Sequence, residues 1–147
     1  MRERGKRWLR AEVFHACERV EGMSNSRTTG PWTLHGVWHE FPLRAPFADL
    51  PGALPFAPLA LFVRLTSRLK RPSRPRELEA HLYHKGEGRC ICRYRFLPQS
   101  FRPGIMVYMA LPLQPPSISI AAWYEFLLVL DDDARTVLAR TEVYLIP

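Results

Sequence analysis

The sequence of 147 residues lacks the features that mark several common classes of protein. It has no run of about 18 uncharged apolar residues, so no segment is expected to span a bilayer. The basic N-terminus has neither the apolar segment nor the small-residue cleavage site of a secretory signal. The chain also has no glycine-rich phosphate loop, no Gly-x-Ser-x-Gly motif and no paired-carboxylate motif. We therefore predict no membrane contact, no cofactor, no metal and no catalytic residue.

Cysteine is scarce, and Cys17, Cys90 and Cys92 are the only three in the chain. Cys90 and Cys92 lie two residues apart in an expected strand, where no unstrained disulfide is expected. An odd number of cysteines without an evident disulfide framework fits a reducing compartment best. We expect a cytoplasmic protein.

Lysine is scarce as well, because only 3 of the 21 basic residues are Lys and the other 18 are Arg. This skew can reflect genome composition, so the net charge of +7 is a weak argument for a polyanionic partner. The charge is nevertheless concentrated in Met1–Arg10 and in Arg64–Arg76, and the second segment holds no acid. We predict a basic tail over residues 1–10 and one domain over residues 11–147.

Proline is abundant, with 14 residues against 8 glycines, and it divides the chain into short segments. Pro42–Pro58 alone carries five prolines, which predicts a long surface loop or crossover because proline is excluded from helix interiors and central strands. Glu18–Pro31 is expected to be a polar connection. About eight segments between the turns alternate apolar and polar residues, as strands do. They are Ala11–Cys17, Trp32–Phe41, Leu59–Thr66, Arg76–Tyr83, Arg89–Phe96, Ile105–Leu113 and two arms around Asp131–Arg135.

The clearest alternation lies in the last third of the chain, where two apolar runs flank the polar corner at Asp131–Arg135 and predict a terminal β-hairpin. A second hairpin is expected around the glycines of Lys85–Gly88. Because side chains alternate across a strand, each arm has one face that we expect in the core. The expected core sets are Val137, Ala139, Thr141, Val143 and Leu145 in the last strand, Leu78, Ala80 and Leu82, and Cys90, Cys92, Tyr94 and Phe96.

These segments predict an all-β protein, because no stretch shows a convincing helical period. A single-domain antiparallel β-sandwich of immunoglobulin-like or jelly-roll-like type over residues 11–147 accommodates about eight such strands. A closed β-barrel is the alternative, since the same alternation can line a barrel interior.

Two patterns that contain histidine could indicate a metal site or a catalytic cysteine, but we prefer a structural explanation for each. His35 and His39 have the spacing of zinc ligands on a helix, but on the expected strand they lie about 13 Å apart, too far to share a metal. Cys17 lies near His15 on one strand face, but free cysteines are usually buried, and nothing else suggests a nucleophile.

Two further groups are weighed in the same way. Cys90 and Cys92 with His81 and His84 lack the usual spacing of a zinc site, so we interpret the cysteines as small buried residues. Asp131–Asp133 could hold calcium between sandwich loops, but aspartates at a solvated turn explain the cluster more simply.

The strongest candidate for a binding site is basic. The segment from Ser67 to Pro75 has two prolines and no apolar period, so it is expected to be an exposed loop. Arg93 and Arg95 are expected on the outward face of the next hairpin. A solvated strand face is the simpler interpretation of this charge. The residues that would bind a polyanion are Arg68, Lys70, Arg71, Arg74, Arg76, Arg93 and Arg95.

Three stretches resemble a family of small bacterial all-β domains of unknown function. They are Ala11–Val20 with its Cys, Leu34–Pro42 with the order Leu-His-Gly-Val-Trp and a Phe-Pro pair, and the final hairpin at Trp123–Asp131 and Val137–Val143. The chain departs from the family pattern by having Trp38 where Phe is commoner, and Ala-Ala before Trp123 where glycine is expected. The resemblance implies a β-sandwich and no catalytic residues.

We therefore predict a non-enzymatic β-sandwich binding or accessory domain that acts through contact with another protein or through self-association. The alternative is a protein that binds nucleic acid or another polyanion through the Arg-rich loop and strand face. A third hypothesis is a calcium-dependent module using Asp131–Asp133.

Overall fold

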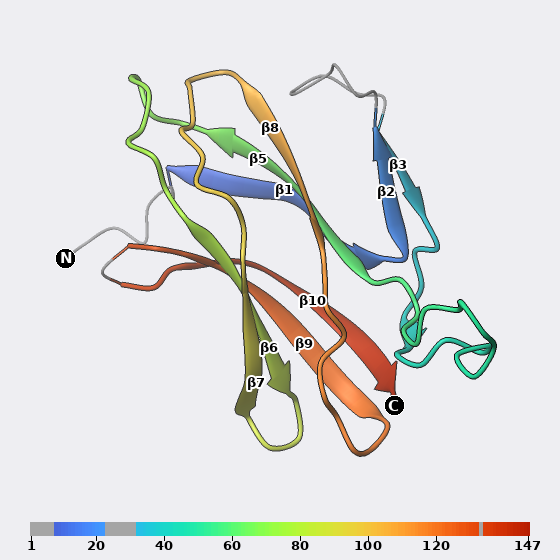
Figure 1. The fold of residues 1–147 in the computed structure, drawn as a ribbon. Coiled ribbons are helices and arrows are strands. Elements are labelled where there is room, and N and C mark those ends of the chain that lie inside the picture. The colour runs from blue at the N-terminus through green and yellow to red at the C-terminus, as the bar shows by residue number, and fades with distance from the viewer. Residues whose placement is uncertain (1–7, 23–31, 133) are drawn as a thin grey trace.

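The computed structural model describes residues 8–22, 32–132 and 134–147. Within these ranges the regular elements are all strands (Figure 1). No helix capable of crossing a membrane occurs among the described residues. The ten strands are β1 (Leu9–Cys17), β2 (Arg19–Gly22), β3 (Trp32–His35), β4 (Glu40–Pro42), β5 (Ala60–Ser67), β6 (Leu78–His84), β7 (Arg89–Arg95), β8 (Met106–Pro112), β9 (Ala122–Leu130) and β10 (Val137–Ile146).

Two sheets face each other, one with the order β1-β5-β8 and one with the order β4-β10-β9-β6-β7 (Figure 1). All pairs are antiparallel except β4, which runs parallel to β10. Strands β2 and β3 form a separate two-stranded sheet. Since the two large sheets do not join at their edges in the described ranges, the predicted β-sandwich is confirmed and the closed barrel is not formed.

The core lies between the two large sheets and is built from alternate residues of their strands. Leu61 and Leu65 of β5, Leu82 of β6, and Phe126 and Leu128 of β9 are all 0% exposed and belong to one apolar cluster. Each such side chain contributes about 1.5–3 kcal/mol by leaving water. Both predicted hairpins are present, because β6 pairs with β7 and β9 pairs with β10.

The outer face of the three-stranded sheet is also covered. Trp32 of β3 packs on Phe62 of β5 with ring centroids 6.0 Å apart and stacks on Tyr108 of β8 at 5.6 Å. Strand β5 is therefore central in its sheet and covered on both faces, which is the physical reason for its apolar residues at both odd and even positions.

Bulges change the predicted faces of two strands. A register shift between Val137 and Ala139 buries Leu138, so the predicted core face of β10 is wrong at Val137. A second shift pairs Cys90 with Tyr83 on the outer face while Ile91 packs against the core. The extra residue in a bulge inverts the alternation beyond it, which a period of two cannot reveal.

Three expectations for the first 42 residues need correction. Residues 1–7 of the expected tail lie outside the described ranges, but β1 begins at Leu9, which is fully buried, rather than at residue 11. The expected connection after Cys17 contains strand β2, paired with β3. The single strand expected from residue 32 to 41 is divided at Gly36, whose φ of 64° lies in the left-handed region that breaks an extended strand.

Candidate functional site

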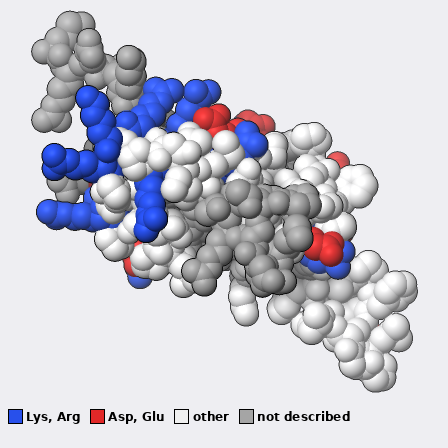
Figure 2. Space-filling view, turned by 90° about the horizontal axis from the view of Figure 1, so that it is seen from above, with Lys and Arg blue, Asp and Glu red and all other residues white. Residues whose placement is uncertain are grey.

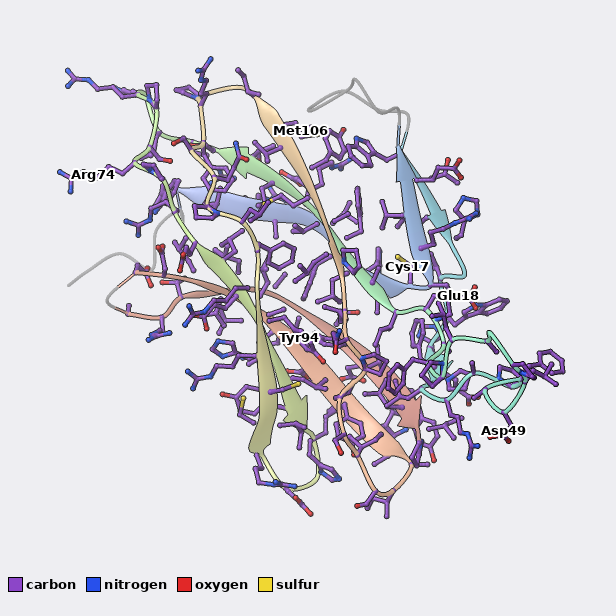
Figure 3. All side chains as sticks on the ribbon, viewed as in Figure 1. Cys17, Glu18, Asp49, Arg74, Tyr94 and Met106 are labelled. Atoms are coloured by element: carbon purple, nitrogen blue, oxygen red, sulfur yellow. The ribbon has the colours of Figure 1, made fainter. Side chains whose placement is uncertain are left out.

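Basic side chains gather at one end of the molecule (Figure 2). The loop between β5 and β6 forms this end, and Figure 3 shows Arg74 directed away from the body of the protein. The backbone N–H of Ser73 donates to the carbonyl of Phe101 at 2.8 Å, so Arg102 of the neighbouring loop joins this end. We call the exposed residues Arg68, Lys70, Arg71, Arg74 and Arg102 the basic end.

The other three residues predicted for polyanion binding lie outside the basic end and have specific neighbours. Arg76 places Nε 3.1 Å from Oδ1 of Asp131 and lies over the Trp8 ring at 5.9 Å, so it is a packing residue. Arg95 of β7 lies directly opposite Glu79 of β6 in the register of the two strands. Arg93 is exposed opposite His81 on the same outer face.

Glu79 partly neutralises this strand face. Its carboxylate lies 2.8 Å from Nε2 of His81 and 3.8 Å from Arg135. The hydrogen bond with His81, with smaller contributions from the charges of His81, Arg135 and Arg95, lowers the pKa of Glu79 below its ordinary value. The predicted stripe of positive charge is therefore interrupted by a carboxylate that stays ionised.

A pocket of about 540 Å³ lies on the side of the sandwich where β1 faces β10. Its innermost residues Ala16 and Val143 are buried, whereas Trp38 is 60% and Trp123 47% exposed. We call it the tryptophan pocket, and it is lined by His15, Ala16, Val37, Trp38, His39, Trp123, Arg140, Thr141, Glu142 and Val143.

The two tryptophans are held by their neighbours. The indole N–H of Trp38 donates to Oε1 of Glu18 at 3.1 Å. Trp123 of β9 meets Tyr144 of β10 edge to face, with ring centroids 5.5 Å apart. Both tryptophan rings are thus held in place in the absence of a ligand. This lowers the entropic cost of binding a ligand against them.

The charged rim of the tryptophan pocket carries both signs. Nη1 of Arg140 bonds Oε1 of Glu125 at 3.0 Å, and Glu142 pairs with Lys85. A rim of this kind has no strong preference for anions, which distinguishes it from the basic end.

A smaller pocket of about 170 Å³ lies at the other end of β1. Leu9 and Ala11 of β1 and Leu138 of β10 supply its apolar wall, and Arg10 and Arg68 lie at its rim. Both pockets therefore lie along the same seam between β1 and β10.

The histidine and cysteine candidates have structural partners. The Nε2–H of His35 donates a 2.7 Å hydrogen bond to Oε2 of Glu21 across β2 and β3. Cys17 is fully buried, and burial raises the pKa of its thiol to about 11, so it stays protonated at neutral pH. His15 of the same strand is exposed and lines the tryptophan pocket. No cluster of three or more metal-binding side chains occurs in the part of the chain that the structure describes.

The acidic corner between β9 and β10 stabilises the turn. Oδ2 of Asp131 accepts the N–H of Glu77 at 2.9 Å, and Asp132 accepts both the N–H and the hydroxyl of Thr136, at 2.8 and 2.5 Å. These bonds agree with the preferred interpretation of the cluster as turn-forming residues. Asp133 lies outside the described ranges.

Sequence reasoning did not find the tryptophan pocket. Its lining comes from β1, the loop after β3, β9 and β10, which are brought together only by the packing of the two sheets. The sequence signals that could have indicated it are Trp38, His39, Trp123 and Arg140. These residues are spread over about one hundred positions, so nothing in the sequence groups them.

No protein-family model and no curated protein sequence matches the chain. Among solved structures, it is similar to the crystal structure of an immunoglobulin-like protein from Pseudomonas aeruginosa, with 9% sequence identity and a TM-score of 0.44. The similarity covers 93% of this chain and 95% of that chain. The fold described above therefore rests on the two sheets themselves, and the resemblance to a bacterial all-β family stays a prediction.

Proposed function

We propose that this chain is a non-enzymatic β-sandwich domain that binds a partner protein at the tryptophan pocket. The observation that carries the proposal is the exposure of Trp38 and Trp123, at 60% and 47%, which both line one cavity. Large aromatic side chains normally leave water, so their exposure in a concave, preformed position favours a partner that covers them.

The chemistry of the pocket supports a protein partner. Tryptophan, tyrosine and arginine are the residues that most often dominate the energy of protein interfaces, and here Trp38, Trp123, Tyr144 and Arg140 lie together. The buried positions beneath them are apolar, and the ion pairs lie at the rim, which is the usual division of an interface into core and edge.

Photo-crosslinking tests the proposal. A benzophenone amino acid at Val37, which is 50% exposed in the pocket, should trap a partner in the native cells. With that partner purified, Trp123→Ala and Trp38→Ala should each weaken binding by about 2 kcal/mol or more by titration calorimetry, as expected for interface hot spots. Leu97→Ala, at an 84% exposed site outside the pocket, is the control and should leave affinity unchanged.

Two results would contradict the proposal. Equal affinity of the three variants would remove the pocket from the interface. A hydrolase activity that disappears on changing His15 or His39, both at the pocket, would overturn the non-enzymatic part. Concentration-dependent sedimentation of the pure protein, lost in Trp123→Ala, would identify the partner as a second copy of the chain.

A second candidate function is the binding of a polyanion at the basic end. The supporting observation is that Arg68, Lys70, Arg71 and Arg74 are exposed together and form no ion pair with an acid of the described residues. Such binding should weaken steeply as the salt concentration rises.

A further inference from the structure

The edge of β10 is only partly occupied by a neighbouring strand. The N–H of Tyr144 donates to the carbonyl of His39 at 2.7 Å, and the N–H of Leu43 donates to the carbonyl of Ile146 at 2.8 Å. Strand β4 therefore adds to β10 only at Tyr144–Ile146. On that side, no strand of the described ranges pairs with the preceding residues 137–143, which we call the free edge of β10.

The backbone of the free edge is oriented for another strand. In an antiparallel ladder every second residue directs its N–H and C=O away from the paired strand. The bond to His39 shows that Tyr144 points away from β9, so Glu142 and Arg140, two and four residues earlier in unbroken register, point the same way. An unpaired row of this kind is a template for an extended peptide.

The side chains of these two residues do not block the edge. Arg140 bonds Glu125 of β9, and Glu142 pairs with Lys85. Both partners lie toward β9 and β6 on the outer sheet surface, on the side opposite to the free edge. These pairings hold the two charged ends over the outer sheet surface, so they leave the backbone of the edge accessible while both side chains still line the tryptophan pocket.

The free edge lies beside β1, the outermost strand of the other sheet, whose backbone comes near that of β10. The tryptophan pocket and the smaller pocket both lie along this edge, beside residues 140–143 and Leu138 respectively. Two apolar cavities along one unpaired edge are what a bound strand needs, because its alternate side chains enter them while its backbone pairs with the sheet.

We propose that the partner of the tryptophan pocket binds as an extended peptide segment that adds a strand to the free edge of β10. This inference rests on the proposed function and states how the partner binds. Seven residues, roughly 24 Å of strand, fill the edge. The segment carries a large apolar side chain for the tryptophan pocket and a small apolar one about four residues away, since positions four apart share a face of a strand.

Charge sets a further feature of the segment. Arg68 and Arg10 lie at the rim of the smaller pocket. Arg10 forms an ion pair with Glu12, with Nε 3.6 Å from Oε1, whereas Arg68 has no ion pair with an acid of the described residues. An acidic residue at that end of the bound segment complements the rim.

A displayed library of random ten-residue peptides, selected against the purified full chain, supplies the probe for a test. The expected consensus is two apolar positions four apart with an acid beyond the smaller one. Binding should slow hydrogen exchange at the amides of Arg140 and Glu142, because those N–H groups become hydrogen-bonded. Two N-methylated versions of the synthetic peptide should be compared, one with methyl groups on the odd-numbered backbone nitrogens and one with them on the even-numbered nitrogens. One version should bind about tenfold or more weakly and the other should bind nearly as well as the parent peptide, since only alternate N–H groups face β10.

Variants of Glu142 separate backbone pairing from side-chain contact. Glu142→Pro removes an outward N–H that the ladder with β9 does not use, so the fold should survive as at other edge positions. It should weaken peptide binding about tenfold more than the matched variant Glu142→Ala, which removes the same side chain but keeps the N–H, and equal losses in the two variants would contradict backbone pairing.

Each alternative outcome has a definite meaning. Peptides that depend on Trp123 but tolerate N-methylation and Glu142→Pro overturn strand addition and leave the proposed function standing. Failure to select any peptide overturns strand addition too, and the crosslinking experiment then judges the proposed function separately. Amide protection at Glu142 that grows with concentration of the protein alone replaces the peptide by a second copy. Peptides that bind only at low salt through Arg71 and Arg74 assign recognition to the basic end.

Discussion

The indole N–H of Trp38 donates to Oε1 of Glu18, and this 3.1 Å bond connects the loop after β3 to the end of β1 (Figure 3 labels Glu18). The backbone N–H of Glu18 in turn donates to the carbonyls of His35, at 2.9 Å, and Gly36, at 3.2 Å. The position of a tryptophan in the proposed binding pocket thus depends on a glycine two residues before it.

We predict that Gly36→Ala destabilises the protein more than an alanine at another left-handed glycine. Gly36 has a φ of 64°, and an added Cβ would overlap the Glu18 side chain. Backbone strain costs about 1 kcal/mol, and displacement of Glu18 adds to it. Gly52→Ala, at a φ of 78° with open space around it, is the matched control for the strain alone. Urea denaturation of both variants measures the difference, and equal losses would contradict a role for the Glu18 contact.

Truncation of a core residue should be costly. Phe126 is 0% exposed and packs near Tyr94, with ring centroids 6.4 Å apart. Phe126→Ala should lower the free energy of unfolding by about 3–5 kcal/mol, because both the transfer energy and the packing of the ring are lost. Leu54→Ala, at a 79% exposed site, should change it by less than about 0.5 kcal/mol. A loss below 1 kcal/mol for Phe126→Ala would argue against the packing of the two sheets described here.

Acid should destabilise the protein partly through Glu79. Because the pKa of Glu79 is lowered on folding, the unfolded chain binds a proton at a higher pH than the folded one. The corresponding stability is present above the ordinary titration range of glutamate, about pH 4.3, and is lost as the pH falls through the lower folded value. Denaturation measured from pH 7 to pH 3 should show a flatter decline in Glu79→Gln. Glu40→Gln, at an exposed site, is the control and should follow the wild-type curve.

Binding of a polyanion would depend on the basic end. If a labelled oligonucleotide binds, log affinity should fall with log salt, with a slope reduced by roughly 0.7–0.9 for each phosphate contact removed. Arg71→Ser with Arg74→Ser should reduce the slope by about two such steps. Arg19→Ser with Arg89→Ser, at exposed sites in β2 and β7, removes the same charge elsewhere and should reduce it less. Absence of retention at low ionic strength would end this hypothesis.

The thiol of Cys17 should be inert in the native state. It is 0% exposed, and burial raises its pKa to about 11, so little thiolate exists at pH 8. In a variant that carries Cys90→Ser and Cys92→Ser, iodoacetamide should leave Cys17 unlabelled until denaturant is added, as followed by mass spectrometry. Rapid labelling without denaturant would show that β1 opens readily.

Much of the architecture could be predicted because strand formation is recorded locally. The alternation in β5, β6 and β9 and the glycines of Lys85–Gly88 place two hairpins and the central strand correctly. Errors arose where one residue interrupts the period, as at Leu138, or where a short strand is mostly polar, as in β2. A strand of four residues with one apolar side chain in the middle resembles a loop by composition, and only its pairing with β3 makes it a strand.

The proposed site was much less accessible to sequence reasoning. The basic loop was found because its charges are neighbours in the chain, yet the partner of Arg76 and the carboxylate beside Arg95 were not. Asp131 and Glu79 are separated in sequence from the arginines they neutralise, so their effect appears only when the strands are paired.

The residues by themselves determined that this chain is a β protein with a central, doubly covered strand and two hairpins, because side-chain alternation and turn chemistry act over a few neighbouring positions. The tertiary structure alone decided which edge of β10 stays open and that Trp38 and Trp123 line one pocket beside it. Those properties depend on how the two sheets pack and where β4 stops, and the contacts that set them join residues about one hundred positions apart.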